Sequence, residues 1–122
     1  ARAVSIIEQS GARPFFIYLA WQNVHWPLEV PQRFVQPYVN TTGGDPHRLQ
    51  IAGMVAALDE GVGNVTRALK RARLWEKTLL IFCSDNGGPT NGNEGTASNN
   101  FPMRGGKNTL WEGGTRLVAV VR

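Results

Sequence analysis

The sequence predicts an α/β fold, because short apolar runs typical of buried strands occur together with one long amphipathic helix pattern. The chain has 122 residues, of which 42% are hydrophobic and 18% are charged, a composition that fits a single globular domain. The strand-like runs occupy residues 15–20, 78–83 and 117–121, and the helical pattern lies between the first two. Strands that are apolar on both faces fit a mainly parallel sheet covered by helices.

The first predicted element is a helix over residues 3–10. Apolar side chains recur there beside polar ones, and Gly11 follows as a helix stop. Pro14 separates this helix from residues 15–20, an aromatic-rich run that we expect to form a buried strand. No periodicity follows over residues 21–46, which contain four prolines, so we expect a long loop of the functional or the disordered kind.

An amphipathic helix is predicted from Ile51 to Ala72. Apolar residues recur at steps of three and four over this range, whereas the opposite face is polar or charged. Gly61 and Gly63 lie inside this pattern, and each costs about 1 kcal/mol relative to Ala in a helix. We therefore expect close packing or a local bend beside these two glycines.

The last two predicted strands are residues 78–83 and 117–121. Glycine, asparagine, threonine and serine dominate residues 89–108 between them, which predicts a loop. The order of strand, loop, helix, strand, loop and strand is that of a right-handed crossover. Because both chain ends fall within predicted elements, we expect residues 1–122 to be part of a larger domain, truncated at both ends.

Charge and cysteine content exclude several classes of protein. The net charge is +4, and basic residues gather at the end of the long helix, where they fit either a solvated helix end or a polyanion-binding patch. No nucleic-acid recognition motif and no apolar run of about 18 residues is present, so we expect neither a nucleic-acid partner nor a membrane span. Cys83 is the only cysteine, which excludes an internal disulfide, and its place in an apolar strand predicts a buried thiol. The basic residues are Arg67, Lys70, Arg71 and Arg73.

Polar groups flank the predicted strands where ligands bind in parallel sheets. His25 follows the first strand, Asp85 and Asn86 follow the second, and Lys107 lies in the loop before the third. Asp85 and Asn86 supply oxygen donors suited to Ca²⁺ or Mg²⁺, although Asp-Asn-Gly is also a good turn sequence. We expect the four side chains to converge in space.

Lys107 and His25 each have a functional and a structural interpretation. Lys107 follows Gly105 and Gly106, which let the backbone approach a tetrahedral oxyanion, although glycine-flanked lysines also occur in ordinary turns. The spacing of a Walker loop is absent. A single histidine such as His25 also fits a purely structural role.

Two N-glycosylation sequons begin at Asn40 and Asn64. Such tripeptides also arise by chance. Asn64, however, lies on the polar face of the predicted long helix, where a glycan can be accommodated. The sequons therefore favour a protein of the secretory pathway.

Four ordered blocks of the sequence resemble the sulfatase family and are most similar to its arylsulfatase B group, the N-acetylgalactosamine 4-sulfatases. The first block is FIYLAWQNVHWPL at residues 16–28, and the second runs from AGMV to GNVT over residues 52–66. The third is SDNGG at residues 84–88, and the fourth combines PMRGGK with LWEGG over residues 102–114. The resemblance covers residues 14–121, and four blocks in order are far more specific than any one of them.

The resemblance implies hydrolysis of sulfate esters on an alkaline-phosphatase-like α/β/α sandwich, with a formylglycine nucleophile and a bound Ca²⁺. Asp85 and Asn86 match the metal ligands of the family, His25 matches the histidine that contacts the substrate sulfate, and Lys107 matches the lysine that bridges sulfate and nucleophile. A cation, a lysine and a histidine donor would together neutralise charge on the sulfuryl group. The implied substrate is a sulfated small molecule or a glycosaminoglycan, and the implied location is the lysosome, the ER lumen or outside the cell.

The formylglycine signature is absent from these residues. It requires Cys or Ser, then Pro or Ala two positions later and Arg two positions after that, and no segment of the chain fits. We therefore expect a sulfatase fragment that supplies part of the metal and sulfate pocket and is inactive by itself. Two alternatives are a catalytically inactive relative that binds sulfated polysaccharide and a metal-dependent phosphohydrolase of the same superfold.

Overall fold

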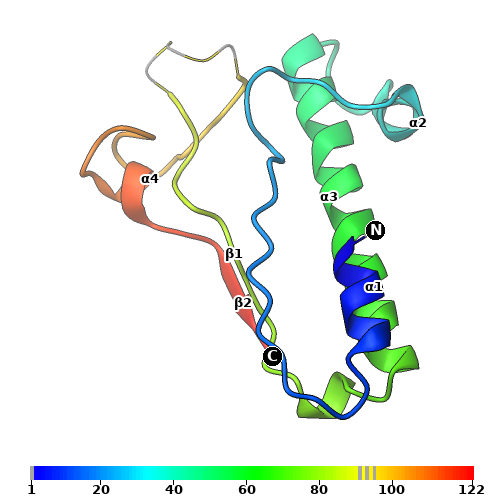
Figure 1. The fold of residues 1–122 in the computed structure, drawn as a ribbon. Coiled ribbons are helices and arrows are strands. Elements are labelled where there is room, and N and C mark those ends of the chain that lie inside the picture. Colours follow the sequence, from blue (N-terminus) through cyan, green and yellow to red (C-terminus); the bar gives the residue numbers. More distant parts are fainter. Residues whose placement is uncertain (1, 91, 93, 95) are drawn as a thin grey trace.

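The computed structural model describes residues 2–90, 92, 94 and 96–122. One long helix, α3 (Pro46–Arg71), stands opposite a small sheet formed by β1 (Ile81–Cys83) and β2 (Ala119–Val121), and α1 (Arg2–Gln9) packs along the lower half of α3 (Figure 1). No helix of these residues has the length and apolar composition needed to cross a membrane. The short elements are α2 (Gln32–Val35), η1 (Gln36–Tyr38), η2 (Trp75–Lys77) and α4 (Glu112–Thr115).

The predicted long helix is confirmed, but it begins earlier than its apolar pattern. Asp45 is the N-cap, and its carboxylate accepts hydrogen bonds from the backbone N–H groups of His47 at 2.9 Å and Arg48 at 3.2 Å. Pro46 occupies the first turn, where a missing N–H leaves no hydrogen bond unmade. The first turn therefore comes from the capping residues, and the apolar period begins only at Ile51.

Glycines on α3 allow other segments to lie directly against the helix backbone. The indole of Trp21 covers Gly61 so closely that a Cβ there would lie 2.5 Å from the ring. At Gly53 a Cβ would lie 3.0 Å from the side chains of both Val30 and Val35. The expected close packing beside Gly61 is thus confirmed, and it fixes the segment after residue 20 on α3.

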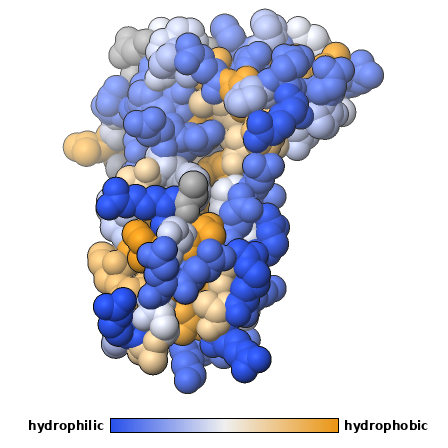
Figure 2. All heavy atoms as spheres, turned by 45° about the vertical axis from the view of Figure 1, so that its right-hand side comes forward, coloured by the Kyte–Doolittle hydropathy of each residue, from blue (hydrophilic) through white to orange (hydrophobic). Residues whose placement is uncertain are grey.

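The hydrophobic core lies between α1 and the C-terminal half of α3. Its centre is formed by Ile7, Ala68 and Leu69, whose exposed fractions are 2%, 0% and 2%. The predicted first helix is confirmed as α1, which supplies Ile7. Seen from the α3 side, the surface is largely hydrophilic, with hydrophobic side chains visible between hydrophilic ones (Figure 2). Partly buried side chains around the centre come from Val4, Phe15, Ile17, Val65, Ala72, Leu74, Trp75 and Leu80.

Residues 15–20 do not form the buried strand that the sequence predicts. They are assigned to no strand, and only Phe15 and Ile17 of the first four pack against the core. Phe16 and Tyr18 are 90% and 84% exposed. An extended chain points successive side chains to opposite sides, and only one side of this segment faces the helices.

The two strands pair antiparallel rather than in the parallel order expected for these runs. Ile81 lies opposite Val121, and Cys83 lies opposite Ala119. The chain leaves β1 through a long loop and α4 without a crossover helix, and it returns in the opposite direction (Figure 1). Cys83 is exposed, not buried as predicted, because it lies on the uncovered face of its strand.

Candidate active site

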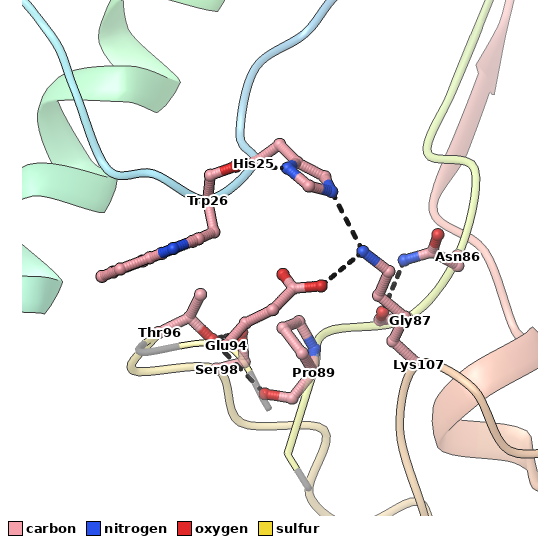
Figure 3. A network of polar contacts seen from close by, with 9 residues as sticks. All are labelled: His25, Trp26, Asn86, Gly87, Pro89, Glu94, Thr96, Ser98 and Lys107. Carbon is pink, nitrogen blue, oxygen red and sulfur yellow. Dashed lines mark hydrogen bonds and ion pairs between the residues drawn. The ribbon is translucent and has the colours of Figure 1, made fainter. Parts of the chain in front are cut away.

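Lys107 is the centre of a polar cluster at the end of the molecule where the loops after β1 and before α4 meet. Its Nζ lies 3.1 Å from Nε2 of His25 and 2.6 Å from Oε1 of Glu94 (Figure 3). Lys107 and His25 are 82 positions apart in the sequence. The structure therefore brings together the two residues that the sequence predicted to bind an oxyanion, and Asn86 points toward the same cluster (Figure 3).

The hydrogen bonds of His25 define which of its nitrogens carries the proton. Nδ1 lies 2.6 Å from the carbonyl oxygen of Trp26, and a carbonyl can only accept a hydrogen bond. Nε2 faces the ammonium of Lys107, which can only donate. Both contacts require the neutral imidazole with its proton on Nδ1. In this arrangement His25 accepts a hydrogen bond from Lys107 through Nε2.

Two contacts with α3 position the segment that carries His25. Trp21 lies against Gly61, and the side-chain amide of Asn23 donates to the carbonyl oxygen of Met54 at 3.2 Å. Trp21 and Asn23, which make these contacts, precede His25 by only a few residues. The imidazole is therefore presented by an irregular segment that α3 holds in place.

Asn100 connects the two loops that flank Lys107. Its Oδ1 accepts from the backbone N–H of Gly88 at 3.0 Å, and its Nδ2 donates to the carbonyl oxygens of Gly88 at 2.8 Å and Gly105 at 3.1 Å. The backbone N–H of Lys107 donates to the same Gly88 carbonyl at 3.0 Å. Sequence reasoning missed Asn100, because a single asparagine in a glycine-rich loop carries no periodic signal.

The glycine pairs of this region allow backbone to pack directly on backbone. A Cβ at Gly87 would overlap the carbonyl oxygen of Gly113, and a Cβ at Gly106 would lie 2.5 Å from the carbonyl oxygen of Gly88. The N–H of Gly87 donates to the carbonyl of Gly114 at 3.0 Å. Since backbone atoms cannot rotate away as side chains do, these positions require glycine.

Asp85 and Asn86 follow β1 and carry oxygen donors, and Asn86 points toward the cluster (Figure 3). The Nδ2 of Asn86 donates to the carbonyl of Gly87 at 2.8 Å, which leaves its Oδ1 able to bind a cation. Within the described part of the chain, the exposed Asp85 carboxylate forms no hydrogen bond or ion pair. Carboxylate and amide oxygens are the types of ligand that a hard cation such as Ca²⁺ prefers.

Two residues supply too few ligands to complete a calcium site. Calcium takes about six to eight oxygen ligands. Residues 2–90, 92, 94 and 96–122 contain no group of three or more His, Cys, Asp or Glu side chains arranged to hold a metal ion. Asp85 and Asn86 therefore fit as part of a ligand set.

Glu94 is a further member of the cluster that sequence reasoning missed. Its carboxylate forms an ion pair with Lys107, and the two side chains are only 18% and 20% exposed. The available signal was that Glu94 is the only charged residue between Pro89 and Asn100. Its partner could not be read from that loop, because no local pattern links it to Lys107.

Comparison with known proteins decides the family. The profile of the sulfatase family matches residues 1–122. The chain belongs to the sulfatase family. Arylsulfatase J of Mus musculus is 43% identical over 110 residues, which cover 89% of this chain and 17% of that protein. N-acetylgalactosamine-6-sulfatase of Canis lupus familiaris is 31% identical over 113 residues, or 93% of this chain and 20% of that protein.

A solved structure extends this similarity to the fold. The crystal structure of Ps i-CgsB in complex with k-i-k-neocarrahexaose superimposes with a TM-score of 0.87 and 36% identity, over 98% of this chain and 26% of that one. The predicted α/β class, as part of the alkaline-phosphatase-like sulfatase fold, is thereby confirmed, although the strand pair within these residues is antiparallel. The chain spans about a fifth of the length of both sulfatases named above. The narrower similarity to the arylsulfatase B group stays a prediction.

Proposed function

We propose that the sulfatase to which residues 1–122 belong hydrolyses sulfate esters, and that this segment supplies Lys107 and His25 to bind the sulfate. The observation that carries the proposal is the contact between Lys107 and His25 at 3.1 Å, beside the loop that carries Asp85 and Asn86. These four positions are also those at which the chain matches the family motifs. Geometry and sequence therefore support the same site.

Lys107 supplies the positive charge that a sulfuryl group needs. Negative charge on the sulfuryl and leaving-group oxygens grows as the ester bond breaks, and a fixed ammonium stabilises it. The Lys107 side chain is 20% exposed, so its field is screened less than that of a fully solvated lysine.

His25 can serve this reaction in two ways that depend on its proton. With the proton on Nδ1, Nε2 accepts from Lys107 and holds the ammonium in place. While Nδ1 keeps its proton, Nε2 can donate to a sulfate oxygen only if the ring takes up a second proton, and the contact with Lys107 must then break because both groups would be cations. The neutral form of His25 therefore orients Lys107, and the charged form adds a second donor.

Asp85 and Asn86 would supply a carboxylate oxygen and an amide oxygen to the ligand set of a calcium ion. A bound calcium supplies Lewis-acid stabilisation of sulfate oxygens. The remaining ligands and the formylglycine nucleophile belong to other parts of the sulfatase. Residues 1–122 alone are accordingly expected to be inactive.

The substrate is proposed to be a sulfated carbohydrate. One relative is an N-acetylgalactosamine-6-sulfatase, and the similar solved structure is a complex with k-i-k-neocarrahexaose. Both names favour a sulfated sugar, within the class that includes glycosaminoglycans. The proposal does not extend to a particular sugar.

We place the protein in the secretory pathway, as a lysosomal, ER-lumenal or secreted glycoprotein. Asn40 and Asn64 are both exposed, as an acceptor for a glycan must be. The Oδ1 of Asn64 accepts a hydrogen bond from Arg67 at 2.8 Å, so a glycan at this position would displace an exposed contact only. Removal of N-glycans from the protein purified from a eukaryotic host is expected to lower its mass.

The test of the proposed function uses the intact protein with an aryl sulfate and Ca²⁺. Lys107→Ala and His25→Ala are expected to lower kcat/KM by on the order of 100-fold or more, because each removes a group at the sulfate. Lys77→Ala and His47→Ala serve as matched controls, since both side chains are exposed and lie outside the cluster. Wild-type turnover by Lys107→Ala would contradict the proposal.

The same assay decides between the alternatives. Faster turnover of an aryl phosphate than of the aryl sulfate would indicate a phosphohydrolase. Binding of sulfated polysaccharide without turnover of any sulfate ester would indicate a catalytically inactive relative. Either result would overturn hydrolysis of sulfate esters as the function.

A further inference from the structure

We infer that Glu94 is a positioning residue for Lys107, fixing the ammonium beside His25 so that it faces the sulfate. The inference rests on the proposed function, since it assigns a role within the same site. It goes beyond that function because Glu94 lies outside the four sequence blocks that match the family motifs.

The geometry around Nζ of Lys107 carries this inference. Oε1 of Glu94 lies 2.6 Å from Nζ, a short charge-assisted hydrogen bond, and Nε2 of His25 lies 3.1 Å from the same atom. The lysine side chain has four rotatable carbon bonds, so one contact alone leaves its end mobile. Among the described residues, His25 and Glu94 accept from Lys107 on two different segments (Figure 3), and together they restrict the direction of the ammonium.

The segment that carries Glu94 is braced against the loop that holds Lys107. The backbone N–H of Thr96 donates to the carbonyl of Glu94 at 2.7 Å, and the Thr96 hydroxyl donates to the carbonyl of Pro89 at 3.3 Å. The Thr96 hydroxyl also shares a hydrogen bond of 2.8 Å with Ser98. Pro89 follows Gly88, whose carbonyl accepts from the N–H of Lys107. The Glu94 carboxylate and the Lys107 ammonium are thus carried by loops that hydrogen bonds connect to each other.

The negative charge of Glu94 indicates whether this residue strengthens the binding of sulfate or orients Lys107. A carboxylate beside the lysine repels an anionic substrate, so Glu94 cannot be present to strengthen sulfate binding. Its benefit must lie in the orientation of Lys107, which acts on the rate of the chemical step. This predicts opposite effects of its removal on kcat and on binding.

The test is a Glu94→Gln variant of the intact sulfatase, which keeps the size of the side chain and removes its charge. We expect kcat to fall about 10- to 100-fold, the usual cost of losing a residue that orients an active-site group, while KM stays unchanged or falls. Thr96→Val is expected to lower kcat in the same direction by a smaller factor, and Thr96→Ser to retain it. Glu76→Gln is the matched control, because Glu76 also pairs with a cation, Arg122 at 2.9 Å, but lies in η2 at the opposite end of the molecule (Figure 1).

A double-mutant cycle with Lys107→Ala shows whether Glu94 acts through the lysine. In the Lys107→Ala background, Glu94→Gln is expected to change the residual kcat by less than about twofold, since the group that it orients is gone. An unchanged kcat in Glu94→Gln, or an equal loss in both backgrounds, would overturn the inference. If Lys107→Ala abolishes turnover and Glu94→Gln does not affect it, only this inference fails. If Lys107→Ala retains full turnover, the proposed function fails as well.

Discussion

The two ends of the molecule are held together by different interactions. The helical end, made of α1, the C-terminal half of α3 and η2, centres on apolar side chains that are at most 2% exposed, Ile7, Ala68 and Leu69. The loop end comprises residues 84–90, 94 and 96–116 with His25. Its contacts are hydrogen bonds, the ion pair between Lys107 and Glu94, and backbone packed on glycine.

The difference follows from what each end must do. Apolar burial contributes stability but is non-directional, so it tolerates small shifts of position. Hydrogen bonds and glycine contacts have narrow geometric limits, and they fix where Lys107 and His25 lie. We therefore expect substitutions in the helical end to change the free energy of unfolding, and substitutions in the loop end to change catalysis.

Leu69→Ala is expected to have the largest effect and would test the helical end. Removing a side chain that is 2% exposed leaves a cavity in the core, and the free energy of unfolding should fall by about 2–5 kcal/mol. Urea unfolding of the intact protein measures this change. Leu69→Met conserves volume and should cost less than about 1.5 kcal/mol. A large loss of kcat in the remaining folded protein would contradict the division between the two ends.

Asn100→Ala tests the loop end, where we expect a loss of catalysis rather than a loss of stability. It removes the three hydrogen bonds that join Gly88 and Gly105, so Lys107 should lose its fixed position and kcat should fall about 10- to 100-fold. Asn99→Ala is the matched control, because Asn99 is exposed and accepts only from the nearby N–H of Phe101. Steady-state kinetics with the aryl sulfate measure the effect. Wild-type kcat in Asn100→Ala would show that backbone contacts alone position the lysine.

Asp45→Ala has the smallest expected effect, because it weakens α3 only at its start, away from the helical core. Loss of the two N-cap hydrogen bonds should lower the free energy of unfolding by about 0.5–2 kcal/mol. Asp45→Asn keeps a capping oxygen and should restore most of this. Thermal unfolding is the measurement. A fall in kcat without a loss of stability would mean that the start of α3 supports the site directly.

The sequence predicted the two longer helices, α1 and α3, well. It did not predict the short helices, of which α2 and η1 lie inside the expected loop over residues 21–46, and it predicted the strands less well. The steps of three and four that define α3 are local, and its predicted end at Ala72 agrees with the observed C-cap. Residues 15–20 have the composition of a strand, but strand formation requires a partner at hydrogen-bonding distance, and composition does not supply one. The antiparallel pairing of β1 with β2 likewise depends on the path of the loop between them.

The site was predicted in part. Lys107 and His25 were expected to meet because both lie in loops beside predicted strands, and the structure places Nζ of Lys107 3.1 Å from Nε2 of His25. Glu94 and Asn100 were missed, since each acts through a pairing between loops that share no period or spacing. The roles of Asp85 and Asn86 in holding a metal, and of Asn40 and Asn64 as glycan acceptors, stay predictions.

The family and the amphipathic helix could be recognised without a structure, because ordered motifs and helical periodicity are properties of neighbouring residues. Which side chains meet depends on the folded chain, as the contacts of Lys107 with His25 and Glu94, 82 and 13 positions away, illustrate. The fold also decided which face of each extended segment is covered, which left Phe16 and Cys83 exposed. Contacts between distant segments depend on the course of irregular loops, and that course is set by the packing of the whole chain.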